Sequence, residues 1–185
     1  GGLIIDRIGV RLAYTLSVGF WSLFTLLQGF TTGISSLLGF RLGLGVAEAP
    51  AYPCNSRVLN SWFPQAERAR ATGVYSIGQY FGLAFLSPLL FFIVASYGWR
   101  TLFLGAGVVG LLFSLLWWQL YREPRASRAN QAELDHIAAG GAIETATPLP
   151  FRWSHIGFLL SKRQVLGASL GQFTSNSTLV FFLTW

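Results

Sequence analysis

The sequence predicts an all-α, polytopic membrane protein. Of its 185 residues, 52% are hydrophobic and 11% are charged, and the mean hydropathy is +0.51, which is typical of membrane proteins and not of soluble domains. Four windows contain no charged residue, and each can cross a hydrocarbon layer of about 30 Å as a helix. These windows are residues 12–30, 71–99, 101–121 and 164–185. With a fifth crossing that begins near residue 31, the sequence predicts five transmembrane helices.

The chain begins with a charged loop before the first of these windows. The loop has the pattern Gly-x-x-x-Asp-Arg-x-Gly-x-Arg, formed by Gly2, Asp6, Arg7, Gly9 and Arg11. Residues 1–11 therefore indicate the end of one helix and a tight turn, in which glycine permits the required backbone conformation.

The next segment places a guanidinium and a carboxylate inside an apolar span. Arg41 and Glu48 are the only charged residues between Thr31 and Ser56. A charge at the centre of a spanning helix costs about 2.5–3.5 kcal/mol, so such residues usually face a bundle interior or a water-filled path. A spacing of seven residues puts both side chains on one face, about 10.5 Å apart along the axis. They are candidates for solute binding, and the alternative is that they pair only to hold a bundle together.

Pro50 and Pro53 follow Glu48 in the same segment. Proline has no backbone N–H, so each one removes a helical hydrogen bond and leaves a carbonyl group open. Inside a membrane, such groups are tolerated only where protein or cavity water satisfies them.

The window 71–99 contains an amide that needs partners. Gln79 follows Gly78, and Gly78 and Gly82 are spaced so that another helix can approach closely. An amide in the bilayer core requires hydrogen bonds from a neighbouring helix or from a polar solute, and both alternatives remain open. The window 164–185 also has a polar middle, which includes Asn176.

The sequence predicts no cofactor and no metal. Residues 105–110 read Gly-Ala-Gly-Val-Val-Gly, but a dinucleotide-binding site needs a preceding strand and a solvent-facing phosphate site. A span without charge provides neither, so these glycines are expected to serve helix packing. One Cys and two His form no metal or catalytic cluster, and His136 and His155 both fall in a polar segment.

That polar segment, residues 122–163, differs from the short turns before it. Leu134 and Ile137 at helical spacing predict a helix over residues 129–143, ended by Gly140-Gly141. The chain thus divides into a transmembrane part (1–121), this loop (122–163) and a further helix (164–185).

The basic residues indicate the orientation of the helices. Ten of the thirteen Lys and Arg lie in three segments, which alternate with two turns that carry almost no charge. The segments are 7–11, 68–70 and 122–163, and the turns are 31–35 and 96–100. By the positive-inside rule, the segments face the cytoplasm and the turns face outward. The net charge of +6 therefore reflects topology, and we expect a lipid bilayer and no nucleic acid as partner.

The loop pattern resembles the major facilitator superfamily of secondary transporters. It is similar to the signature between helices 2 and 3, where the aspartate and the basic residues act as a latch for the outward-open state. The resemblance implies part of a twelve-helix fold, with the end of helix 2 to helix 6 in residues 1–121. The central cytoplasmic loop would be 122–163, and helix 7 would be 164–185. It also implies a multi-pass protein of the bacterial inner membrane that is monomeric at full length.

The stretch from Arg41 to Pro53, with Asn55 and Arg57, resembles the anion:cation symporter family within that superfamily. It is most similar to bacterial hexonate and hexarate:proton symporters of galactonate or glucarate type. The resemblance implies that Gln79 lines the substrate site, with Asn176 as a further contact. Because a guanidinium offers a planar fork matched to a carboxylate, Arg41 is the candidate for binding the substrate's carboxylate. Glu48 is the candidate for proton coupling.

The predicted function is proton-coupled uptake of a small organic anion, a hexonate or hexarate, and we expect no enzymatic activity. The window 164–185 carries no basic residue, which favours polyhydroxy acids over glutamate within the family. Two alternatives remain open: transport of another carboxylate or organic anion, and a passive anion channel lined by the same charges.

Overall fold

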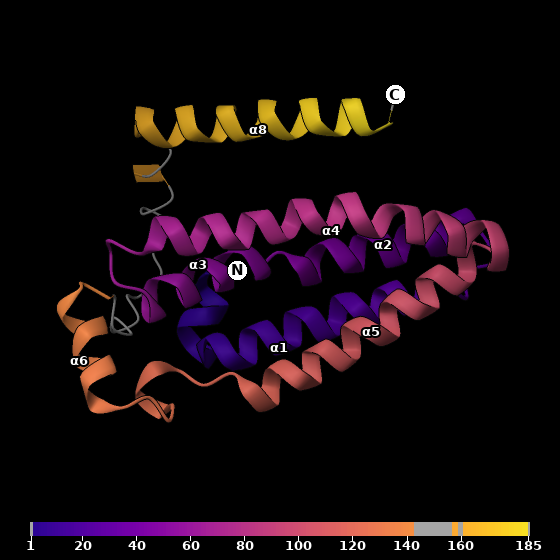
Figure 1. Ribbon diagram of the computed structural model, residues 1–185. Helices are drawn as coiled ribbons and strands as arrows, with labels where there is room; N and C mark the ends of the chain where they lie inside the picture. The colour runs from indigo at the N-terminus through magenta and orange to yellow at the C-terminus, as the bar shows by residue number, and fades with distance from the viewer. Residues whose placement is uncertain (1, 143–156, 159–160, 185) are drawn as a thin grey trace. The chain divides into compact units, whose positions relative to one another are not determined.

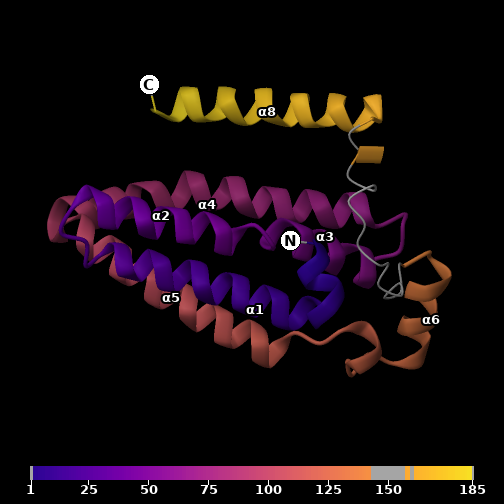
Figure 2. The same cartoon turned by 180° about the vertical axis from the view of Figure 1, so that it is seen from behind.

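The computed structural model describes residues 2–142, 157–158 and 161–184, and the regular structure within them is entirely helical (Figures 1 and 2). The helices are α1 (Gly2–Gln28), α2 (Ile34–Glu48), α3 (Ala51–Trp62), α4 (Arg68–Tyr97), α5 (Trp99–Leu120), the short 3₁₀ helix η1 (Pro124–Ala126), α6 (Gln131–Ala139) and α8 (Arg163–Thr184). The chain forms two units, Gly1–Thr147 and Pro148–Trp185, and α8 belongs to the second.

The predicted all-α, polytopic class is confirmed. In the described part of the chain, three helical segments are long and apolar enough to cross a membrane: Ile5–Gln28, Arg68–Tyr97 and Trp99–Leu120. The crossing predicted from residue 31 is divided into α2 and α3, of 15 and 12 residues. α8 has 22 residues, and its polar middle makes it less hydrophobic than the three apolar spans.

α1 is the centre of the first unit, where it packs against α5, α2 and α3 (Figures 1 and 2). Its contact with α5 includes close approaches at small residues. Gly107 lies against Leu26 and Gly110 lies against Ser22, so closely that a Cβ on either glycine would overlap its neighbour. Small residues let two helix backbones approach in this way. The helix-packing role predicted for this glycine run is therefore confirmed.

The loops alternate between the two ends of the first unit, as the sequence predicts. The α1–α2 and α4–α5 turns lie at one end, where Arg100 Nη2 donates to the Thr31 carbonyl at 3.2 Å. At the other end, Arg11 Nε donates to the Trp118 carbonyl at 2.9 Å, and its guanidinium lies 4.1 Å from the centre of the Trp118 ring. We call these the turn end and the loop end.

The helices of the first unit differ in how much of their surface is covered. A buried cluster of Ile5, Val10, Ala13 and Cys54 forms where α1 meets α3 near the loop end. By contrast, α2 and α4 contain no buried residue. The described residues therefore leave faces of α2 and α4 uncovered.

Candidate functional site

The segment that carries Arg41 and Glu48 is broken directly after Glu48. α2 ends at this residue and α3 begins at Ala51, while Ala49 and Pro50 keep helical backbone angles (φ −53°, ψ −33° and φ −77°, ψ −15°). Pro50 cannot donate to the carbonyl four residues before it, so the ladder of helical hydrogen bonds is interrupted. The opened backbone predicted from the prolines is present, and the chain continues in the same general direction.

A serine of α1 donates to a carbonyl at the break, next to the Val46 carbonyl that Pro50 leaves open. In an uninterrupted helix the Ala47 carbonyl would accept from the Ala51 N–H. Here it accepts instead from Ser17 Oγ at 2.5 Å, and Ser17 is 4% exposed. Sequence reasoning missed Ser17, because nothing in the window 12–30 distinguishes it from other serines. The prolines indicated that open backbone carbonyls would need a hydrogen-bond donor, but the sequence did not show that Ser17 would be a donor.

Arg41 and Glu48 lie on α2, seven residues apart in one unbroken helix. Both side chains are exposed in the first unit. Within the described residues, neither has a hydrogen bond or an ion pair, so no contact supports the alternative that they pair with one another. The arrangement offers a cationic fork and a carboxylate on one face of α2, before the break.

Gln79 lies on α4 and is also exposed. A Cβ added at Gly78 would meet no other atom within 4 Å, and at Gly82 it would meet only Leu86 of the same helix. The close helix approach expected at these two glycines is therefore absent among the described residues. Asn176 lies on α8, in the second unit, with an exposed side chain.

The loop motif forms the end of one helix and a sharp bend at a glycine, as predicted from the sequence. α1 starts at Gly2 and bends at Gly9, where φ is 78° and ψ is 161°. Glycine adopts a positive φ readily because it has no Cβ. Arg7 is exposed on the short arm before the kink.

Asp6 and Arg11 of the motif hold the loop end together. Arg57 Nη2 of α3 donates to Asp6 Oδ1 at 2.6 Å, and this ion pair is partly exposed. Arg11 binds the backbone and the ring of Trp118 at the end of α5. The motif thus joins α1 to the loop-end parts of α3 and α5.

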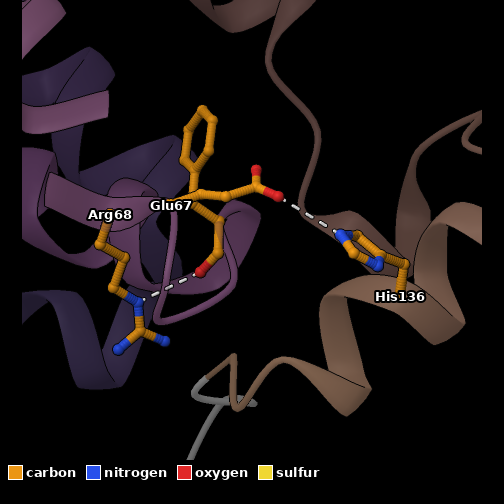
Figure 3. Close-up of polar contacts among 4 residues, drawn as sticks. Glu67, Arg68 and His136 are labelled. Carbon is orange, nitrogen blue, oxygen red and sulfur yellow. Dashed lines mark hydrogen bonds and ion pairs between the residues drawn. The ribbon is translucent and has the colours of Figure 1, made fainter. Parts of the chain in front are cut away.

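The polar segment also contacts the loop end, which sequence reasoning did not predict. α6 realises the helix expected over residues 129–143, although residue 143 lies outside the described part. Arg68 Nη2 donates to the Gly141 carbonyl at 2.7 Å, and Arg68 Nε donates to Phe63. His136 Nε2 lies 3.4 Å from Glu67 Oε1 (Figure 3). These contacts attach α6 to the loop between α3 and α4.

A cavity of about 400 Å³ lies at the loop end, between the arm of α1, α3 and α6. Its polar lining includes Arg57, Tyr121 and Asp135. It contains none of the candidate substrate residues, so it is separate from the charged face of α2.

The described residues combine three helical segments able to cross a membrane with a broken helical segment, α2–α3, that carries one cation and one anion on α2. Residues 1–185 match the sequence profile of the Major Facilitator Superfamily, and the chain belongs to this superfamily. The recognition made from the loop motif is confirmed at this level. The protein is accordingly a multi-pass protein of the inner membrane.

Its relatives include named sugar-acid transporters. The D-galactonate transporter of Escherichia coli O6:H1 is 43% identical over 196 residues, which cover all of this chain and 45% of that protein. Probable galactarate/D-glucarate transporters of Bacillus subtilis and Escherichia coli K12 are 36% and 38% identical over 198 and 201 residues. The alignments cover all of this chain and 44% and 45% of those proteins. The chain thus spans less than half the length of these relatives.

Proposed function

We propose that the protein is a secondary active transporter that couples proton movement to the uptake of a sugar acid, a hexonate or hexarate. The observation that carries the proposal is the exposed pair of Arg41 and Glu48 on one face of the broken helix α2–α3. The names of the relatives support the substrate class. The protein would move its substrate without changing it, so it is not an enzyme.

Arg41 binds the carboxylate of the substrate. Its guanidinium can donate two parallel hydrogen bonds to one carboxylate, which adds geometric selectivity to the charge attraction. It has no protein partner within the described residues, so no ion pair has to break before an anion binds.

Gln79 forms hydrogen bonds with the hydroxyl groups of the substrate, and Asn176 provides a second contact. A primary amide presents both donors and an acceptor without charge, which suits a polyhydroxy chain. The exposed face of α4 around Gln79 and Gly78 leaves space for a solute.

Glu48 carries the proton. Glu48 lies two turns from Arg41 on the same face of α2, so a bound anion and a bound proton would occupy neighbouring positions. Each ligand would neutralise one member of this pair of opposite charges, which is the basis of the proposed coupling. The coupling is reciprocal: if a bound anion raises the affinity for a proton, a bound proton must raise the affinity for the anion by the same factor.

The loop end faces the cytoplasm. Residues 122–163 form the central loop between two halves of the transporter. The motif from Gly2 to Arg11 acts as a latch that holds the outward-open state. The basic residues at this end support the orientation. A single cysteine at Ala126 should not react with an impermeant reagent in intact cells, whereas one at Thr32 should. Strong labelling at Ala126 would reverse the orientation.

Transport by the full-length protein in proteoliposomes tests the proposal. With an inward proton gradient, labelled galactonate, galactarate or glucarate should rise above its external concentration, and a protonophore should abolish this accumulation. Equilibration of substrate without accumulation would identify a passive channel instead. A full-length protein of about monomeric size in detergent is also expected.

A further inference from the structure

A hydrogen bond joins α3 to α4 on the loop-end side of Arg41 and Glu48. Asn55 Nδ2 donates to Tyr75 Oη at 2.9 Å. Tyr75 is 41% exposed and Asn55 is partly buried, so the pair lies at the edge of the packed part of the first unit. The proposed function leaves these two residues without a role.

The pair continues both polar faces of the candidate site toward the loop end. Asn55 follows Glu48 by seven residues, which places it on the same face about 10.5 Å further along the axis. The face persists through the break because Ala49 and Pro50 keep helical backbone angles. On α4, Tyr75 precedes Gln79 by four residues, about one turn. The two series of polar side chains therefore meet at the Asn55–Tyr75 bond.

Other faces of α3 are already occupied. Cys54 is buried against Ile5 and Val10 of α1, and Arg57 pairs with Asp6. Arg57 stands two residues after Asn55, about 200° around the helix. Asn55 is thus directed away from the latch contact and toward α4.

The bond leaves hydrogen-bonding capacity on both partners. The Tyr75 hydroxyl remains a donor, and it has no acceptor among the described residues. The Asn55 side chain also bonds Tyr14 of α1, so part of its hydrogen-bonding capacity is already used. Within a membrane, such groups need water, protein or a polar solute. Both groups are neutral, so they are suited to hydroxyl groups and not to a carboxylate.

We propose that Asn55 and Tyr75 form a second binding station, which holds hydroxyl groups of the sugar acid on the cytoplasmic side of Arg41 and Glu48. This inference rests on the proposed function. Asn55 lies fourteen residues after Arg41, about 21 Å along the axis, which is longer than a six-carbon acid. One molecule cannot contact both, so the station binds the solute after it leaves Arg41.

The test compares substrate affinity from the two sides of the membrane. Tyr75→Phe in the full-length protein keeps the ring and removes the hydroxyl. In inverted vesicles, where substrate approaches from the cytoplasmic side, it should raise the half-saturating concentration of galactonate about 3- to 10-fold. In right-side-out vesicles the change should be less than about 2-fold, since the outer approach meets Arg41 first. Tyr97→Phe, on the same helix at the turn end, is the matched control and should change neither value.

Deoxy-galactonates separate binding from a structural effect. If the station binds a hydroxyl group, Tyr75→Phe should not weaken cytoplasmic-side binding of the deoxy analogue that lacks this hydroxyl. Asn55→Ala should give the same result. An equal loss from both sides, with every analogue affected alike, would show that the bond only joins two helices and would overturn the station alone. A parent protein that transports no sugar acid from either side would overturn the proposed function together with the station.

Discussion

The contact between α1 and α5 differs from the exposed faces of α2 and α4 in burial and in residue composition. Of the most apolar part of α1, 28% is buried, whereas none of the corresponding part of α4 is. The closest approaches between α1 and α5 are made at glycine, serine and leucine, while Arg41, Glu48 and Gln79 all lie on α2 and α4. The comparison indicates that α1 and α5 form the support, and that Arg41, Glu48 and Gln79 lie on faces that the described residues leave uncovered.

Arg41→Lys should have the largest effect on the exposed faces. Lysine keeps the charge but loses the planar fork, which should cost about 1.5–3 kcal/mol of substrate binding, or about 10- to 150-fold in half-saturating concentration. Uptake in proteoliposomes measures the change. Arg100→Lys at the turn end is the control and should transport normally. Near-parent affinity in Arg41→Lys would assign Arg41 a structural role.

Gly107→Ala tests the α1–α5 contact. The added Cβ would lie 2.5 Å from Leu26 Cβ and 2.7 Å from the Leu26 backbone, so the two helices must separate. We expect the free energy of unfolding to fall by about 1–3 kcal/mol, measured by denaturant titration in detergent. Gly105→Ala, which meets nothing within 4 Å, should be neutral or slightly stabilising. Equal effects at the two positions would contradict the close packing described for α1 and α5.

Ser17→Ala links the two regions, because Ser17 belongs to α1 and its hydroxyl donates to the Ala47 carbonyl at the break. Loss of this hydrogen bond leaves a partly buried carbonyl without a partner and should reduce stability by about 1–2 kcal/mol. Ser36→Ala removes an exposed serine that bonds within its own turn and should have little effect. If both variants unfold alike, Ser17 does not support the break.

Gln79→Ala should have a smaller effect, on selectivity more than on stability. Loss of one hydrogen bond to a hydroxyl group should reduce the discrimination between sugar-acid stereoisomers about 2- to 10-fold. Competition between galactonate and its stereoisomers measures this ratio. Gln119→Ala, near the loop end of α5, provides the control. An unchanged ratio would mean that Gln79 contacts another helix in the complete protein.

The fold was predictable because membrane helices are evident in the composition of the chain. The windows without charge located α1, α4, α5 and α8, and the alternation of basic residues predicted which loops share an end. The bend at Gly9 was predicted from the loop motif, because glycine permits the positive φ found there.

The candidate site was predictable only in part. Rare charges within an apolar span identified Arg41 and Glu48, and two prolines indicated the break. Contacts between distant segments were missed, because a serine or a tyrosine has no special sequence context when its partner lies elsewhere. Ser17 with Ala47 and Arg68 with Gly141 are examples.

Glu48→Gln is the most direct test of the central claim that the charged face of α2 couples protons to substrate. Glutamine resembles the protonated carboxyl in shape and cannot release a proton, so substrate binding should remain while coupling is lost. In proteoliposomes, the variant should exchange labelled for unlabelled substrate at a rate similar to the parent, yet it should not accumulate substrate under an inward proton gradient. If Glu48→Gln concentrates substrate as well as the parent does, Glu48 is not the coupling site.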